Sequence, residues 1–130
     1  TLAAGVVDEV LRYESSLIAT YRTALRATEI RGQSIAQGEK GLTLIGAGNR
    51  DPRLFDDPDR FDIGRGNAAR HLSFGGGIHF CVGAELARLE GRIAFERLAT
   101  RLPGLTVDVD APAWREGFLF RGMSALRAQW

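Results

Sequence analysis

The feature that most constrains the fold of this chain is a glycine-rich loop, Phe74–Gly83, which contains the only cysteine. Cys81 follows three consecutive glycines and His79, and a run with helical periodicity begins directly after it. A thiolate there would be stabilised by the partial positive charge at the N-terminus of that helix. Glycines have no Cβ, so a bulky flat group could approach the backbone closely. This combination indicates a metal-bearing cofactor held by one sulfur.

The loop resembles the cysteine-ligand loop of the cytochrome P-450 family, Phe-x-x-Gly-x-His-x-Cys-x-Gly. Every fixed position of that pattern is matched, by Phe74, Gly77, His79, Cys81 and Gly83. The resemblance implies that Cys81 is the axial thiolate ligand of haem iron, in haem b (iron protoporphyrin IX). It also implies that His79 binds a haem propionate, that Phe74 shields the sulfur together with Phe80, and that the two glycines permit close approach of the cofactor.

The residues alone leave other interpretations of the loop open. A free cysteine is ordinarily buried and inert. Structural zinc commonly needs several cysteines, and this chain offers one Cys and two His. A cysteine nucleophile would need a base, for which His79 is the neighbour in sequence. Gly75, Gly77 and Gly83 do not keep the spacing of a dinucleotide-binding fingerprint.

A helix is predicted over residues 3–14, where Glu9 and Arg12 stand three positions apart and therefore share a face. Taken alone, such a pair is a surface ion pair of about 0–1 kcal/mol. In the resembling family, Glu-x-x-Arg is the K-helix motif, which implies a buried network completed by an arginine of the later meander. Arg60 fits that position best, and Arg65 is the alternative.

The rest of the pattern predicts strands over residues 17–35, with a hairpin turning at Gly32, and a further strand over 42–45. An ordered meander follows over 53–70, then a long helix over 82–102 with an apolar stripe, and short terminal strands over 105–130. Arg22 is either a solvent-facing strand residue or, by the resemblance, a haem-propionate ligand. The expected fold class is α+β. The resemblance implies the C-terminal part of the cytochrome P-450 fold: K helix, small β-sheet, meander, cysteine-ligand loop, L helix and terminal strands.

Bulk properties fit one domain over residues 1–130. The net charge of +1 argues against a nucleic-acid partner, and no apolar run is long enough to predict a membrane span. A single cysteine excludes an internal disulfide framework, which fits a reducing, cytoplasmic location.

The resemblance implies a haem-thiolate monooxygenase, an oxidoreductase that inserts oxygen into a small organic substrate. A ferredoxin or flavoprotein would donate electrons, and Arg70, Arg88 and Arg92 could form its docking surface. Family members are about three times as long as this chain, so we expect it to be the C-terminal third of a longer bacterial-type polypeptide. The alternative is a catalytically incompetent standalone fragment that self-associates to cover apolar surface. Asp8 lies outside the matched positions, so Asp8→Asn is expected to be neutral.

Overall fold

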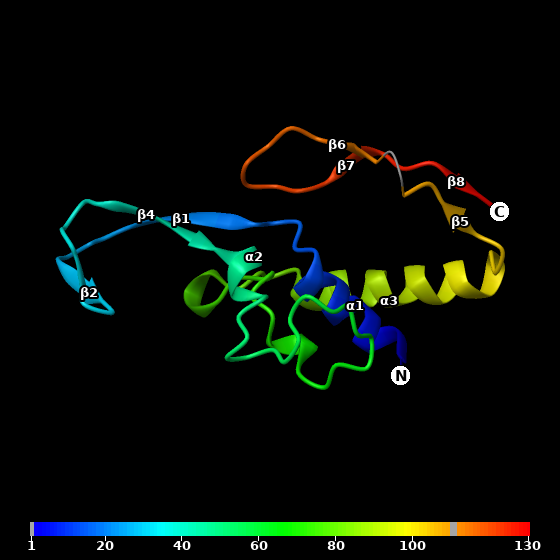
Figure 1. Ribbon diagram of the computed structural model, residues 1–130, viewed down its shortest axis with the longest axis horizontal. Coiled ribbons are helices and arrows are strands. Elements are labelled where there is room, and N and C mark those ends of the chain that lie inside the picture. The colour runs from blue at the N-terminus through cyan, green and yellow to red at the C-terminus, as the bar shows by residue number, and fades with distance from the viewer. Residues whose placement is uncertain (1, 110–111) are drawn as a thin grey trace.

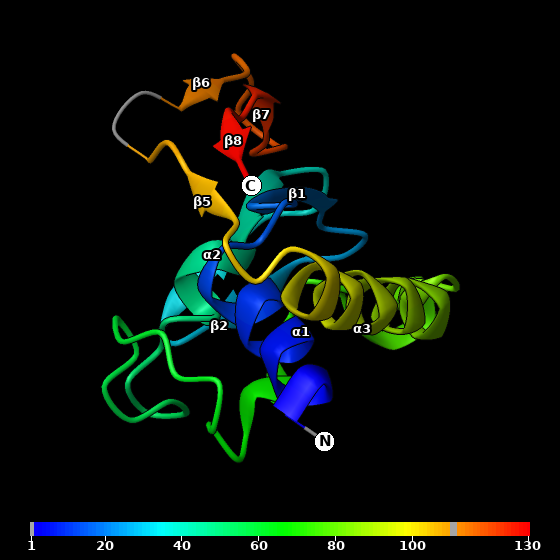
Figure 2. The ribbon, with the colours of Figure 1, turned by 90° about the vertical axis from the view of Figure 1, so that its right-hand side faces the viewer.

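The computed structural model describes residues 2–109 and 112–130 and has the α+β architecture expected from the sequence. Two α-helices of three turns or more, α1 (Leu2–Tyr13) and α3 (Ala84–Arg101), lie side by side (Figures 1 and 2). The shorter helical elements are α2 (Ile45–Gly48), η1 (Ala68–Arg70) and η2 (Gly77–His79). None of the helices within the described ranges is long and apolar enough to span a bilayer.

The strands of the described residues pair in four two-stranded antiparallel ribbons. Near the N-terminus, β1 pairs with β4 and β2 pairs with β3 in a hairpin whose turn contains Gly32 at φ +79°. Near the C-terminus, β5 pairs with β8 and β6 pairs with β7. Their bounds are β1 Ala19–Thr23, β2 Thr28–Ile30, β3 Gln33–Ile35, β4 Lys40–Leu44, β5 Thr106–Val107, β6 Ala113–Trp114, β7 Met123–Ala125 and β8 Ala128–Gln129.

The C-terminal ribbon is joined to the segment that links α1 to β1. The Ile18 N–H donates to the Leu119 carbonyl at 2.9 Å, and the Arg121 N–H donates to the Ser16 carbonyl at 2.7 Å. Backbone pairing of this kind fixes the register of the two segments. The loop between β6 and β7 is thereby held over the start of β1 (Figure 1).

The helices α1 and α3 approach closely because a glycine lies at their contact. A Cβ at Gly91 would stand 3.1 Å from a methyl group of Val7, so a larger side chain would push the helices apart. Val7 is one of the few large apolar side chains that are buried, together with Ile45 and Phe55. The core is small and sits where α1, α3 and the meander meet.

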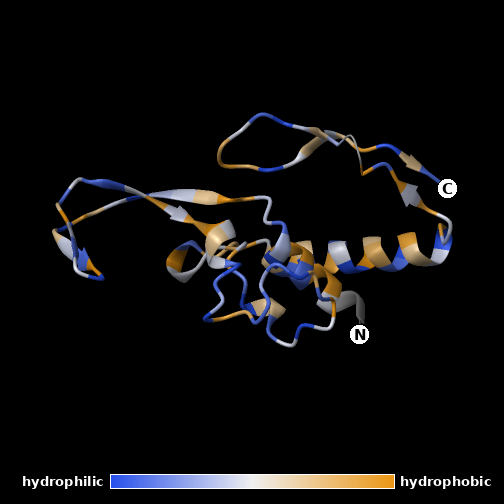
Figure 3. Ribbon diagram, in the orientation of Figure 1, coloured by the Kyte–Doolittle hydropathy of each residue, from blue (hydrophilic) through white to orange (hydrophobic). Residues whose placement is uncertain are grey.

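The predicted apolar stripe of the second long helix is present but largely uncovered. Its positions stay exposed in this chain: Leu86 is 59% exposed, Leu89 43%, Ile93 46% and Leu98 42%. Hydrophobic and hydrophilic residues alternate along the ribbon of α3 (Figure 3). The helical periodicity therefore predicted the helix correctly. The burial expected of an apolar stripe is not seen at these positions within the described part of the chain.

Candidate functional site

The glycine-rich loop is closed by one backbone hydrogen bond, from the Cys81 N–H to the Phe74 carbonyl at 2.8 Å. Gly75 and Gly77 both have positive φ, +74° and +62°, which residues with a Cβ rarely adopt. At Gly75 a Cβ would also lie 3.2 Å from a backbone carbonyl oxygen. These glycines are therefore needed for the turn that brings Cys81 back beside Phe74.

Cys81 lies just before the N-terminus of α3, as the sequence predicts. Its carbonyl accepts the N–H of Ala84, the first residue of the helix, at 3.2 Å. The thiol is exposed. The exposure excludes the inert, buried cysteine that was one alternative for this loop.

An open cavity of about 460 Å³ brings four of the predicted site residues together: Arg22, Phe74, His79 and Cys81. Arg22 comes from β1, and the other three come from the loop some fifty residues later. The remaining predicted residues, Gly77 and Gly83, lie outside the lining of this cavity. The fold thus places Cys81, Arg22 and His79 in the lining of one cavity.

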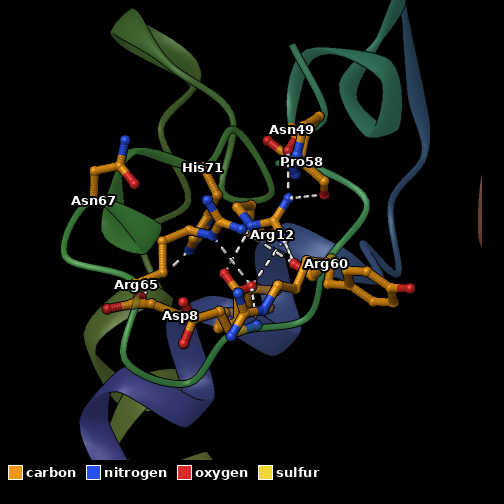
Figure 4. A network of polar contacts seen from close by, with 12 residues as sticks. Asp8, Arg12, Asn49, Pro58, Arg60, Arg65, Asn67 and His71 are labelled. Atoms are coloured by element: carbon orange, nitrogen blue, oxygen red, sulfur yellow. Dashed lines mark hydrogen bonds and ion pairs between the residues drawn. The ribbon is translucent and has the colours of Figure 1, made fainter. Parts of the chain in front are cut away.

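Beneath the loop, Glu9 and Arg12 form an ion pair that is removed from solvent, with 0% and 1% of each residue exposed. Arg12 donates from Nε to Glu9 Oε2 at 2.7 Å and from Nη2 to Oε1 at 2.8 Å. Its remaining N–H groups donate to the carbonyls of Asn49, Pro58 and Arg60 at 3.0, 2.8 and 3.0 Å (Figure 4). The pair is therefore a buried network and not the surface ion pair that the spacing alone would allow.

The third side chain of this network is Arg65, and the preference for Arg60 was wrong. Arg65 Nε lies 3.3 Å from Glu9 Oε1, and its side chain is 8% exposed. Arg60 contributes its carbonyl, which accepts from both Arg12 and Arg65, while the residue itself is exposed. At this position the main chain, and not the side chain, takes part in the network.

Burial alone would raise the pKa of Glu9, because it disfavours the charged form. Hydrogen bonds from Arg12 and from the Asp62 N–H outweigh burial and hold the pKa below its ordinary value. Glu9 is therefore a carboxylate at neutral pH.

A buried amide that sequence reasoning missed connects α1, α2 and the cysteine loop. Asn49, fully buried, donates to Ser15 Oγ at 2.7 Å and to Ser73 Oγ at 2.9 Å. Its Oδ1 accepts the Leu72 N–H at 2.6 Å. The only sequence signal was its position in Asn49-Arg50-Asp51-Pro52, a segment that resembles one in the cytochrome P-450 family.

Asp8 was expected to be remote from the site, and the structure contradicts this. Its Oδ1 lies 2.9 Å from Arg88 Nε and 3.4 Å from Nε2 of the buried His71. Asp8→Asn would remove the charge that Arg88 and the His71 ring face, so it is unsuitable as a neutral control. Neither His71 nor Asp8 carried a signal in the sequence, because their proximity depends on the packing of η1 against α1.

The comparisons with known proteins agree with this geometry. The profile of the cytochrome P-450 family matches residues 1–102. The chain belongs to this family. Members of the cytochrome P-450 family carry a haem cofactor.

Curated relatives of this cytochrome P-450 chain come from bacteria. It is 44% identical over 133 residues to the cytochrome P-450 monooxygenase PikC of Streptomyces venezuelae, covering 100% of this chain and 32% of that protein. It is 46% identical over 124 residues to the 6-deoxyerythronolide B hydroxylase of Saccharopolyspora erythraea, covering 94% of this chain and 30% of that protein. The chain therefore spans about a third of the length of the curated relatives it matches.

Solved structures give the same result. The cytochrome P-450 CREJ superposes with a TM-score of 0.94 at 43% identity, over 99% of this chain and 32% of that one. A second similar structure is the P-450 BioI bound to an acyl carrier protein that carries hexadec-9Z-enoic acid, with a TM-score of 0.94 at 44% identity over 99% of this chain and 33% of that one. The expected fold, the C-terminal part of the cytochrome P-450 architecture, is confirmed.

Proposed function

We propose that this chain forms the thiolate side of a haem-thiolate monooxygenase site, with Cys81 as the axial ligand of haem iron. The observation that carries the proposal is the exposed thiol on a cavity wall that Arg22 and His79 also line. Family membership supports the cofactor assignment. Arg22 lies on β1, so the tertiary structure brings it to the thiol, whereas His79 on η2 is two residues from Cys81 in the same loop.

The side chains on this wall fit haem b by their chemistry. The cofactor has one iron, which a thiolate can ligate, and two propionates, for which Arg22 and His79 are suitable donors. Gly83 leaves room beside the sulfur, since a Cβ there would be 3.9 Å from Sγ. When bound, haem with a thiolate ligand supplies the activation of O₂.

The residues of this chain would hold the sulfur in place and keep it from water. Phe74 and Phe80 stand edge to face with ring centroids 6.3 Å apart, on the loop that carries Cys81. Apolar rings near a ligating sulfur restrict solvent access and so tune the metal's potential. The Glu9–Arg12 network anchors the meander that precedes the loop and is a structural component, not a catalytic one.

The substrate class and the partners are part of the same proposal. The substrate would be a small organic molecule, and a ferredoxin or flavoprotein would supply electrons in the cytoplasm. Arg70 and Arg92 are exposed and suit an acidic partner. Arg88 is less suitable for docking, because its guanidinium is paired with Asp8 and Glu85.

Reconstitution with haemin tests the proposal. The reduced, CO-treated chain is expected to show the strongly red-shifted Soret band of a thiolate-ligated haem, and Cys81→Ser should abolish that band. Arg26→Gln, at an exposed position outside the cavity, is the matched control and should leave the spectrum unchanged. If the reduced, CO-treated Cys81→Ser variant still showed the red-shifted Soret band, the ligand assignment would be refuted.

A second candidate is a non-enzymatic fragment that self-associates. The exposed apolar positions of α3, among them Leu86 and Ile93, favour it. Sedimentation of the wild-type chain against Leu86→Glu/Ile93→Glu distinguishes the two. Dimers that dissociate in the variant, with no haem absorbance in either chain, would support this second candidate.

A further inference from the structure

His71 is a buried histidine that the proposed haem site does not use. It is 7% exposed and directly follows η1, which packs against α1. Its Nδ1 accepts the Ser73 N–H at 3.1 Å, so a neutral ring carries its proton on Nε2. Nε2 is buried and makes no hydrogen bond of good geometry, although Asp8 Oδ1 is 3.4 Å away. A buried polar atom in this state is unusual and suggests a role beyond packing.

The groups around His71 converge on the aromatic ring of Phe74. The His71 and Phe74 ring centroids are 5.3 Å apart, and the Arg88 guanidinium lies 4.9 Å from the Phe74 centroid. Asp8, drawn with His71 in Figure 4, fixes both neighbours, because its Oδ1 faces Arg88 Nε and His71 Nε2. Glu85 holds Arg88 from α3 at 2.9 Å. Phe74 is thus contacted by two side chains that face one carboxylate.

The position of Phe74 determines the position of the thiol. The Phe74 carbonyl accepts the Cys81 N–H, and both residues line the same cavity. We propose that His71 is a positioning residue for Cys81: in its neutral form it holds Ser73 and Phe74, and through the Phe74–Cys81 hydrogen bond it fixes the thiol in the cavity wall. The inference rests on the proposed function in taking Cys81 as the ligand that needs to be positioned.

Protonation of His71 would weaken this arrangement. A protonated imidazole is a donor at both nitrogens, so Nδ1 could no longer accept the Ser73 N–H. Burial lowers the pKa of His71, the Asp8 carboxylate raises it, and Arg88 lowers it again. Among the described residues, Asp8 of α1 and Arg88 of α3 are the charged groups that face the ring. The folded pKa lies below the unfolded value of 6.5, so the stabilisation is complete above pH 6.5 and declines as the pH falls below it.

Hydrogen exchange of the Cys81 amide in the haem-free chain tests the proposal, because that amide makes the loop-closing bond. At about pH 7.5, His71→Leu should lower its protection about tenfold, or about 1.4 kcal/mol, relative to the amides of α1 and α3. His71→Asn keeps an acceptor for the Ser73 N–H and should recover part of the protection. Arg26→Gln, at an exposed position outside the cavity, should have no effect.

A pH series provides a readout that a merely structural role would not move. Between about pH 7.5 and pH 5.5, the protection of the Cys81 amide relative to the α3 amides should fall in the wild type and stay constant in His71→Asn. Equal losses at all amides in His71→Leu, or a wild-type ratio independent of pH, would overturn the proposal. Since no haem is present in these measurements, a failed reconstitution would refute the proposed function without altering their outcome.

Discussion

Replacing Arg12 by leucine tests the idea that a charged network, more than apolar packing, holds the centre of this chain together. The guanidinium has five N–H donors, and all five are used, two on Glu9 and one each on the carbonyls of Asn49, Pro58 and Arg60. Leucine fills part of the volume but donates nothing.

The cost follows from what the substitution leaves behind. Glu9 is 0% exposed, and breaking a buried ion pair by removing one partner costs about 3–5 kcal/mol. The carbonyls of Asn49 and Pro58 lose their Arg12 donor as well, at about 1–3 kcal/mol for each one that water cannot reach, while the Arg60 carbonyl keeps its hydrogen bond from Arg65. Against a total of about 5–15 kcal/mol for a typical domain, Arg12→Leu should remove most of the free energy of unfolding.

Urea unfolding at pH 7, followed by far-UV circular dichroism, measures the loss. Arg26→Leu, the same change at an exposed position, is the control and should stay within about 0.5 kcal/mol of the wild type. The double variant Glu9→Leu/Arg12→Leu should recover only part of the loss, because it removes the stranded charge but not the unsatisfied carbonyls. If Arg12→Leu alone costs less than about 1 kcal/mol, the network is not what stabilises this region.

Four further outcomes are expected. The stabilisation from Glu9 should be complete above pH 4.5, the ordinary value, and be lost as the pH falls through its depressed folded pKa, which acid titration of the unfolding free energy can follow. Gly75→Ala should cost about 1–2 kcal/mol in urea unfolding because its φ is +74°, whereas Gly76→Ala, with φ −167° and open space around it, should be neutral. Asn49→Leu should cost about 1–3 kcal/mol for each buried partner left unsatisfied, and a midpoint in urea equal to the wild type would contradict this. Hydrogen bonds from the side chain and the N–H of Arg53 lower the pKa of Asp51 to about 2, and in Arg53→Gln, which keeps the N–H, a carboxylate NMR titration should find that pKa raised toward 3.8 without reaching it.

Local patterns in the sequence predicted the elements that depend on neighbouring residues. The helix expected over 3–14 is α1, the hairpin turns at Gly32, and the long helix follows Cys81. These features depend on periodicity and turn chemistry within a few residues, which a single sequence displays directly. The cysteine motif was recognisable for the same reason, because its fixed positions span only ten residues.

Features that depend on the path of the meander were not predictable in the same way. The sequence favoured Arg60 over Arg65, and only the folded path of the meander brings the Arg65 side chain to Glu9 while Arg60 contributes its carbonyl. Asn49 and His71 are buried polar residues, and no periodic pattern marks a polar group that will be buried. The exposure of the apolar positions on α3 was likewise invisible to periodicity, because a hydrophobic stripe does not specify what covers it.

The guanidinium at position 12 recognises the meander by main-chain oxygens alone at Pro58 and Arg60. Every amino acid has such an oxygen, so the side chains at these two positions can change over evolution while the hydrogen bonds from Arg12 are kept. The meander sequence should therefore diverge among relatives while the path of its main chain is kept. An alignment would then display an unchanging arginine at position 12 and no covarying residues at positions 58 and 60. Searches for coupled substitutions would overlook this attachment, although it joins segments nearly fifty residues apart.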